Sequence, residues 1–275
     1  ERRPLFQEGA DVFSTPIDQV YTRSINDPQV VGKAIGRMDR TTLGYIGGLD
    51  ETSPILIPLE ERSYVGQTRT SVSNIVRAQQ SFMDDSYAGV LFTDRRFIDH
   101  DGSNTSLGVD GPLRVLEKYR FGWPRVGTHS QVRTDSTLSS GVHDLTFDAG
   151  KRTVAYDGES FFGNAASATV RRNARTWNFN LSYRHFSPTF RVDNGFETRN
   201  DMRRVSMYQG LSFWPSASWI DRVGPGVFGA MAWNWAGQKK SDYEQLWLNA
   251  QLKGQTSLEP AFEIENERFG CIDFT

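Results

Sequence analysis

The sequence predicts an all-β fold, an antiparallel up-and-down transmembrane β-barrel of about twelve or more long strands with an irregular N-terminal segment. Three observations predict it. Apolar residues recur at every second position rather than at helical spacing. Segments of roughly ten residues, longer than most strands, are joined by tight turns. Tryptophan, tyrosine and phenylalanine gather toward the ends of these segments, as at the two interfaces of an outer-membrane barrel.

Composition excludes several other classes of protein. The 275 residues include 31 lysines and arginines and 33 aspartates and glutamates, so no strongly basic domain is available to bind nucleic acid. No stretch approaches the roughly 18 consecutive apolar residues that indicate a transmembrane helix. The single Cys271 excludes a disulfide within the chain and a cysteine-based zinc site. A membrane protein with this composition would therefore cross the bilayer with strands.

The alternation is clearest between Trp177 and Tyr183, where the apolar residues share one face and the polar residues share the other. Short turn-forming stretches such as Asp39-Arg40, Asp84-Asp85 and Asn173-Ala174-Arg175 separate this and the other segments into hairpins. The predicted strands are Val30–Asp39, Thr41–Glu51, Ser73–Phe82, Tyr87–Phe97, Ser106–Glu117, Tyr119–His129, Ala166–Arg172, Trp177–Tyr183, Met202–Trp214, Val227–Gln238, Tyr243–Gly254 and Pro260–Phe269.

Three longer polar connections, Ile98–Thr105, Thr134–Gly158 and Pro188–Asp201, alternate with the short turns, as barrels place short turns on one side and long loops on the other. A soluble β-sandwich would also alternate apolar and polar residues, so the period alone leaves both architectures open. The aromatic residues near strand ends favour the barrel; they are Trp177, Tyr183, Phe213, Trp214, Trp219, Trp233 and Trp235.

We expect residues 26–275 to form the barrel domain and residues 1–25 to follow an irregular path, for which Pro4 and Pro16 are suited. The N-terminal residues that are too polar for lipid are Glu1, Arg2, Arg3 and Glu8. One hypothesis is that this segment acts as a plug in the barrel mouth or lumen. The alternative is a periplasmic connector.

Acidic residues of the last predicted strand, including Glu263 and Glu265, alternate with Phe262 and Ile264 and therefore share a face that needs water. We expect this face to line a hydrated lumen, with basic partners on neighbouring strands; the candidates are Arg171, Arg172 and Arg184. A lumen with both charges favours polar, hydrated solutes. Glu263 and Glu265, with Asp94, could instead serve a membrane-embedded glycoside hydrolase.

Three tryptophans beside glycine- or proline-rich turns, Trp123, Trp214 and Trp219, are candidates for stacking against a saccharide. Anchoring at the membrane interface is the alternative role for the same side chains.

Metal and catalytic motifs are weak. Asp99, Asp101 and Asn104 resemble part of a calcium-binding loop, but Asp110 stands where the distal glutamate is needed, which favours a polar loop. The four histidines lack metal-binding spacing, and no nucleophile elbow, phosphate-binding loop or dinucleotide fingerprint occurs in the sequence. The sequence therefore predicts no enzyme and no cofactor.

Several segments resemble a known family. The opening Glu1–Phe13 is similar to the start of the C-terminal part of a Gram-negative envelope family, catalogued as domain of unknown function 5916. Ser187–Asp201 resembles a second hallmark of that family, and Tyr87–Arg96 and Gly108–Gly111 resemble intermediate ones. The resemblance implies an outer-membrane β-barrel connected with carbohydrate, in a longer chain that carries a family 9-type carbohydrate-binding domain upstream. It brings no catalytic residues.

The expected function is an outer-membrane β-barrel protein that binds or passes a polar, carbohydrate-like ligand, located in the outer membrane of a Gram-negative bacterium. The first alternative is a structural or docking barrel without an open pore, which anchors a soluble carbohydrate-binding domain or an envelope protein partner. The second is the hydrolase. The expected partners are outer-membrane lipid, the polar or saccharide ligand and the envelope protein, with no nucleic acid.

Overall fold

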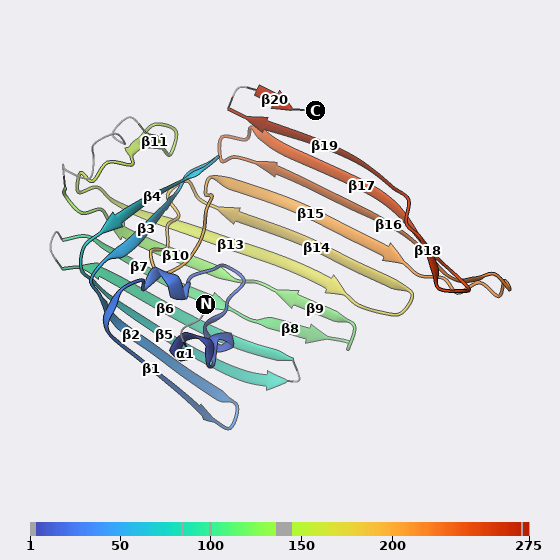
Figure 1. Ribbon diagram of the computed structural model, residues 1–275, viewed down its shortest axis with the longest axis horizontal. Helices are drawn as coiled ribbons and strands as arrows, with labels where there is room; N and C mark the ends of the chain where they lie inside the picture. The colour runs from blue at the N-terminus through green and yellow to red at the C-terminus, as the bar shows by residue number, and fades with distance from the viewer. Residues whose placement is uncertain (1–3, 84, 99–100, 136–144, 271, 275) are drawn as a thin grey trace. The chain divides into compact units, whose positions relative to one another are not determined.

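The computed structural model describes residues 4–83, 85–98, 101–135, 145–270 and 272–274 (Figure 1). These residues form an almost entirely β structure that divides into two compact units. The first unit comprises Glu1–Pro112, Trp123–Ser167 and His185–Met202, and the second comprises Leu113–Gly122, Ala168–Arg184 and Arg203–Thr275. The N-terminal segment belongs to the first unit.

The first unit begins with three short helical turns, α1 (Pro4–Gln7), η1 (Ala10–Phe13) and η2 (Thr22–Ser24). Its strands are β1 (Pro28–Met38), β2 (Thr41–Asp50), β3 (Ser53–Pro58), β4 (Ser63–Thr68), β5 (Ser71–Met83), β6 (Ser86–Phe97), β7 (Ser103–Asp110), β10 (Arg125–Gln131), β11 (Thr146–Phe147) and β12 (Arg152–Thr153). Two strands, β13 (Ser160–Arg172) and β14 (Trp177–Phe186), run through both units.

The second unit contains the remaining strands, except that the first residues of β8 and β15, Pro112 and Met202, belong to the first unit. They are β8 (Pro112–Val115), β9 (Tyr119–Gly122), β15 (Met202–Leu211), β16 (Ile220–Trp233), β17 (Lys239–Leu252), β18 (Thr256–Leu258), β19 (Ala261–Phe269) and β20 (Ile272–Phe274).

Chain neighbours are also sheet neighbours for most of these strands. The strand order is β1-β2-β5-β6-β7-β10-β13 in the first unit and continues β14-β15-β16-β17-β19-β20 in the second. The pairs with a defined register are antiparallel, as in β2 with β5, where Ile46 faces Ile75. Two hairpins stand outside the large sheet, β3 with β4 and β11 with β12. The prediction of an all-β, antiparallel, up-and-down fold with long strands is confirmed.

Individual strand boundaries differ from the predictions in physically understandable ways. The predicted strand Ser106–Glu117 is interrupted at Gly111, where an added Cβ would lie 2.1 Å from the Tyr87 carbonyl oxygen. The β3–β4 hairpin was not predicted because Pro54 and Pro58 suggest a loop, although proline is tolerated in edge strands. Strand β16 begins well before the predicted Val227, because antiparallel pairing with β17 carries it through Pro225.

The first unit has a core on one face of its sheet. Segments from outside the large sheet pack against that face in three clusters. The first contains Phe6, Val12, Phe13, Ile25, Ile46, Ile75 and Leu91; the second contains Ile17, Val126, Ala165, Phe186, Phe190 and Val192; the third contains Ile55, Ile57, Leu59, Phe97 and Val154. In Figure 1 the N-terminal segment, drawn in dark blue, lies against the strands of this unit.

The second unit has no comparable core among its described residues. Only Gly210, Ile220, Ala232 and Asn234 are buried there. Both faces of its long strands are therefore accessible in the part of the chain that the structure describes.

Candidate functional site: a polar sheet face closed by the chain's own segments

The buried face of the sheet in the first unit, here called the polar face, carries many polar side chains beside the apolar residues of the core, and the opposite face, here called the apolar face, exposes large apolar side chains. Side chains alternate between the two, so each strand contributes to both. The buried polar residues on these strands are Asp50, Ser71, Ser73, Arg77, Thr93, Arg95, Asn104, Ser106, Asp110, Thr128 and Ser130. The exposed apolar residues, from 36% to 78% accessible, are Leu43, Tyr45, Val76, Val90, Phe92, Leu107 and Phe162. A soluble domain rarely buries so many polar side chains, or exposes so many large apolar ones, on a single sheet.

The N-terminal segment covers the polar face with apolar side chains. Phe6, Phe13 and Ile25 are almost fully buried in the first cluster, and Ile17 is completely buried in the second. The side chain of Gln19 reaches the sheet itself, where its Oε1 accepts a hydrogen bond of 3.3 Å from Ser106 Oγ. The segment is therefore held both by hydrophobic burial and by hydrogen bonds, such as that from the Tyr21 backbone N–H to the Asn194 carbonyl oxygen at 2.7 Å.

Of the polar residues predicted to form the plug, Glu8 alone lies within the described residues. Glu1, Arg2 and Arg3 lie outside the described residues. The side chain of Glu8 is exposed, and only its backbone carbonyl contacts the sheet, accepting a hydrogen bond from Lys33 Nζ. Burial of apolar residues accounts for the position of the described part of the segment.

Arg95 on β6 connects the sheet to two covering segments. Its guanidinium donates hydrogen bonds to the backbone carbonyl oxygens of Ser24, at 2.9 Å, and Asp193, at 2.7 Å. It also donates to Ser71 Oγ at 3.2 Å and lies 3.7 Å from the Asp50 carboxylate. The side chain is fully buried, so these contacts replace the water that an arginine normally keeps.

A second buried ion pair crosses from β5 to β7. Arg77 donates to both carboxylate oxygens of Asp110, at 2.5 and 3.0 Å, and the Tyr87 hydroxyl donates to the same carboxylate at 3.1 Å. The intervening strand leaves room for the arginine because it has Gly89, where a Cβ would lie 2.5 Å from Arg77 Nη2.

The segment Ser187–Asp201 folds over the same face. The Asn104 amide donates to the Arg191 carbonyl at 3.0 Å and to Ser130 Oγ at 2.9 Å, and its oxygen accepts from the Asp193 backbone N–H at 2.9 Å. Arg191 and Asp193 form a buried ion pair of 2.6 Å. Burial raises the pKa of the nearby Tyr156, against the opposing charge of Arg191.

We call these residues the inner polar layer: Asp50, Arg77, Arg95, Asn104, Asp110, Arg191 and Asp193. Sequence reasoning did not single it out, although Arg95, Asp110 and Asp193 lie within segments that carry the family resemblance. The alternation of β5 also indicates that Arg77 is buried, because Arg77 lies on the same side of the strand as Ser73 and Ile75, which are buried. The layer can fix the covering segments in place, and its complete burial leaves no room for a substrate.

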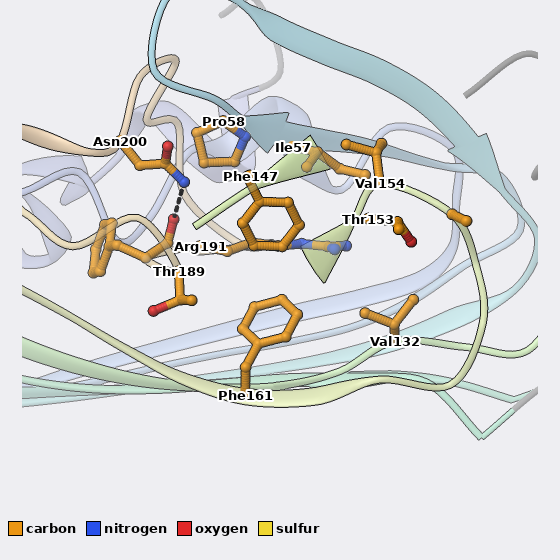
Figure 2. Close-up of a pocket in the computed structure, with 12 residues that line it drawn as sticks. Ile57, Pro58, Val132, Phe147, Thr153, Val154, Phe161, Thr189, Arg191 and Asn200 are labelled. Atoms are coloured by element: carbon orange, nitrogen blue, oxygen red, sulfur yellow. Dashed lines mark hydrogen bonds between the residues drawn. The ribbon is translucent and has the colours of Figure 1, made fainter. Parts of the chain in front are cut away.

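A small pocket lies beneath the covering segments. Figure 2 shows its apolar walls, with Phe147 and Phe161 packed edge to face at a centroid distance of 5.6 Å. The cavity volume is only about 10 Å³, which is barely enough for one water molecule. This pocket is not a ligand site.

The predicted pairing of acids with arginines on neighbouring strands is wrong. Glu263 on β19 accepts hydrogen bonds from the Tyr243 hydroxyl, at 2.8 Å, and from Gln245 Nε2, at 3.4 Å. Three strands, β15, β16 and β17, separate β14 from β19 in the sheet order, because an up-and-down sheet keeps distant strands apart. The arginines concerned are Arg171 and Arg172 on β13 and Arg184 on β14. Glu265 shares the face of Glu263 and is exposed.

Arg172 takes part in a local contact instead. Its guanidinium donates to the Trp177 carbonyl and lies 4.6 Å from the centroid of the Trp177 ring. Arg171 and Arg184 are exposed.

The polar face of the second unit carries an aromatic pair that the sequence analysis missed. Tyr208 and Trp247 stack with ring centroids 5.5 Å apart at 22°. The indole lies over Gly226, where a Cβ would be 2.1 Å from a ring carbon. The register places Gly226 opposite Trp247, so the glycine is the feature from which this packing could have been expected.

The three predicted tryptophans are substantially exposed and occupy connections. Trp214 and Trp219 lie between β15 and β16, and the guanidinium of Arg175 is 4.5 Å from the Trp214 ring centroid. Trp123 lies between β9 and β10.

Two of the three residues suggested for a calcium loop lie within the described part of the chain. Asp99 lies outside the described residues, Asp101 is exposed, and Asn104 belongs to the inner polar layer. In the described part of the chain, no cluster of three or more histidine, cysteine or acidic side chains could hold a metal ion. The described helices include none with the length and hydropathy needed to cross a membrane.

Comparison with known proteins gives likenesses to solved structures. No protein-family model and no curated protein sequence matches the chain. It is similar to the crystal structure of BamA from Haemophilus ducreyi lacking POTRA domains 1–3, with a TM-score of 0.35 and 10% sequence identity. The match covers 89% of this chain but only 63% of the BamA chain. A likeness at this level carries no conclusion about function.

Proposed function

We propose that this protein is an outer-membrane β-sheet protein of a Gram-negative bacterium, which serves as a sealed anchor for an envelope partner or a soluble domain. The observation that carries the proposal is that one sheet face of the first unit exposes large apolar side chains, while the other face, with its buried charged and polar groups, is filled by the chain's own segments.

Lipid is the environment that suits such an exposed face. Apolar side chains from neighbouring strands lie side by side there, as in the registers that join Val76 to Phe92 and Phe92 to Leu107. In water this continuous surface would promote aggregation, whereas hydrocarbon lowers its free energy. The sequence resemblance to a Gram-negative envelope family supports the same location.

The filling of the polar face favours an anchor over an open pore. The N-terminal segment and Ser187–Asp201 both contact the sheet, and Arg95 hydrogen-bonds to each of them. A solute could pass along this face only after several buried hydrogen bonds had been broken, each with a cost of about 1 kcal/mol or more.

Planar-bilayer recording with the full-length protein tests the anchor. We expect no solute-sensitive current from correctly inserted protein, as judged by resistance to carbonate extraction. Deletion of residues 4–25 should open a leak for small solutes from loaded liposomes. A steady solute-sensitive current in the intact protein would contradict the sealed state, and an unchanged leak after the deletion would contradict the plug.

Binding of a polar ligand is the second candidate function, favoured by the uncovered polar face of the second unit. There Trp247, which stacks on Tyr208, shares β17 with Tyr243, whose hydroxyl donates to Glu263 on β19; this combination of aromatic surface and hydrogen-bonding groups is suited to a saccharide. Titration with oligosaccharides, followed by tryptophan fluorescence, should give saturable binding that Trp247→Ala removes. A response that is unchanged in this variant would contradict this use of the face.

A further inference from the structure

The exposed apolar face of the first unit is interrupted by a groove. The groove spans β7, β10 and β13 and has a volume of about 740 Å³. Its floor is Gly127, which faces Leu107 on one side and Asn164 on the other. The lining residues are Thr105, Leu107, Val109, Arg125, Val126, Gly127, Thr128, His129, Phe162, Gly163, Asn164, Ala165, Ala166 and His185.

The groove combines an apolar wall with cationic and hydrogen-bonding groups. Arg125 and His129 flank Gly127 along β10, two residues away on either side, and so share its face. The His129 ring lies 3.0 Å from Ser160 Oγ and packs on Phe162 with centroids 4.6 Å apart. His185 Nε2 lies 3.1 Å from the side-chain oxygen of Asn164.

The charge of the groove is unbalanced. No aspartate or glutamate is among its lining residues. The guanidinium of Arg125 makes no hydrogen bond or ion pair with another described residue, whereas Arg96, on the same face, is paired with Asp94 at 2.9 Å. An unpaired arginine in a largely apolar groove that also offers hydrogen-bonding groups is complementary to an anionic group.

We propose that this groove binds the phosphate-bearing head group of a membrane lipid, with Arg125 contacting the phosphate and an acyl chain lying along Leu107 and Val109. The inference rests on the proposed membrane location and deepens it. A lipid fits better than free phosphate because most of the lining is apolar and the groove opens onto the face proposed to meet hydrocarbon. Arginine near a membrane interface keeps its charged end at the head groups while its stem lies in the apolar region.

Native mass spectrometry of the full-length protein in detergent tests this site with two probes, dioleoyl phosphatidic acid and dioleoyl phosphatidylcholine. We expect at least a tenfold preference for phosphatidic acid in the wild type. Arg125→Gln should reduce that preference to within about threefold. Arg96→Gln, which removes a paired arginine from the same face, should leave it intact. Equal retention of the two lipids by the wild type would overturn the proposal without use of any variant.

A second variant fills the groove without straining the backbone. An added Cβ at Gly127 meets no atom within 4 Å, and the same holds at Gly36, on the same face of β1. Gly127→Leu should abolish phosphatidic acid retention, whereas Gly36→Leu should preserve it. Displacement of the lipid by millimolar inorganic phosphate, with no requirement for an acyl chain, would overturn the lipid assignment. Membrane insertion is scored separately by carbonate extraction, so failure of the groove is distinguishable from failure of the membrane location.

Discussion

Arg77 on β5 holds both carboxylate oxygens of Asp110 on β7 across the intervening strand β6, with N–O distances of 2.5 and 3.0 Å. Both side chains are almost completely buried. Water does not compete for this pair, so each charge depends on the other for its solvation.

Loss of one member of this pair should therefore be severe. Arg77→Ala leaves the Asp110 carboxylate buried with only the Tyr87 hydroxyl as a partner, and we expect a loss of about 3 to 5 kcal/mol in the free energy of unfolding. Denaturant titration of the refolded protein in detergent measures it. Lys151→Ala is the control, because the Lys151 side chain is 73% exposed in the β11–β12 turn and its ion pair with Asp148 should contribute less than about 1 kcal/mol. Equal effects of the two substitutions would contradict the importance of burial.

Replacement of Arg95 should loosen the covering segments before it unfolds the sheet. Arg95→Met preserves much of the side-chain volume but removes the hydrogen bonds to the Ser24 and Asp193 carbonyls. We expect chymotrypsin to cleave after Phe6 or Phe13 at least several times faster than in the wild type, since local opening exposes these sites. Arg184→Met, at an exposed position, should leave the cleavage rate unchanged. An unaltered rate in Arg95→Met would argue against a holding role for Arg95.

A charge on the apolar face reports directly on its environment. Val90 is 44% exposed and lies beside Val109 on β7. In lipid, Val90→Lys should cost about 2 to 4 kcal/mol if the site is near the midplane, whereas in water it should change stability by less than about 0.5 kcal/mol. Unfolding of liposome-inserted protein by denaturant measures the difference. Leu116→Lys, in the exposed β8–β9 turn, serves as the control. A negligible cost at Val90 would speak against lipid on this face.

The close approach of Trp247 to Gly226 predicts sensitivity to a single methyl group. Gly226→Ala places a Cβ 2.1 Å from an indole carbon, so the ring must move away from Tyr208. We expect a loss of about 1 to 3 kcal/mol from overpacking and a change in the near-UV circular dichroism of the stacked rings. Gly229→Ala, on the same strand with no atom within 4 Å of its Cβ, should show neither effect. An identical near-UV spectrum in Gly226→Ala would exclude this packing.

Much of the strand arrangement was predictable because it depends on local sequence. Apolar and polar residues alternate through segments such as Trp177–Tyr183, and turns such as Asp39-Arg40 lie between adjacent strands that pair antiparallel. Strand limits were less predictable where pairing overrides local preference, as at Pro225 in β16. The β3–β4 hairpin was missed because proline is typical of loops, whereas here Pro54 and Pro58 lie in a strand that pairs with β4 outside the large sheet.

The candidate site was much harder to predict than the strands. Glu263 and Glu265 were expected to find arginine partners, but Glu263 is bound by Tyr243 and Gln245 from the strand next to it. The inner polar layer joins Ser24, Arg95 and Asp193, which are distant in the chain and come together only when two covering segments fold onto the sheet. Similarly, the groove over Gly127 exists only because three strands are in register.

By itself, the sequence determined that these segments are strands, that neighbours in the chain pair antiparallel, and which residues share a face, because a period of two is a local property of the extended backbone. Only the tertiary structure decided which face is covered. That choice depends on where residues 4–25 and 188–201 pack, and their position follows from burial of Phe13, Ile17 and Phe190 against strands remote in sequence. Alternation cannot specify it, since either face of a strand can be the buried one.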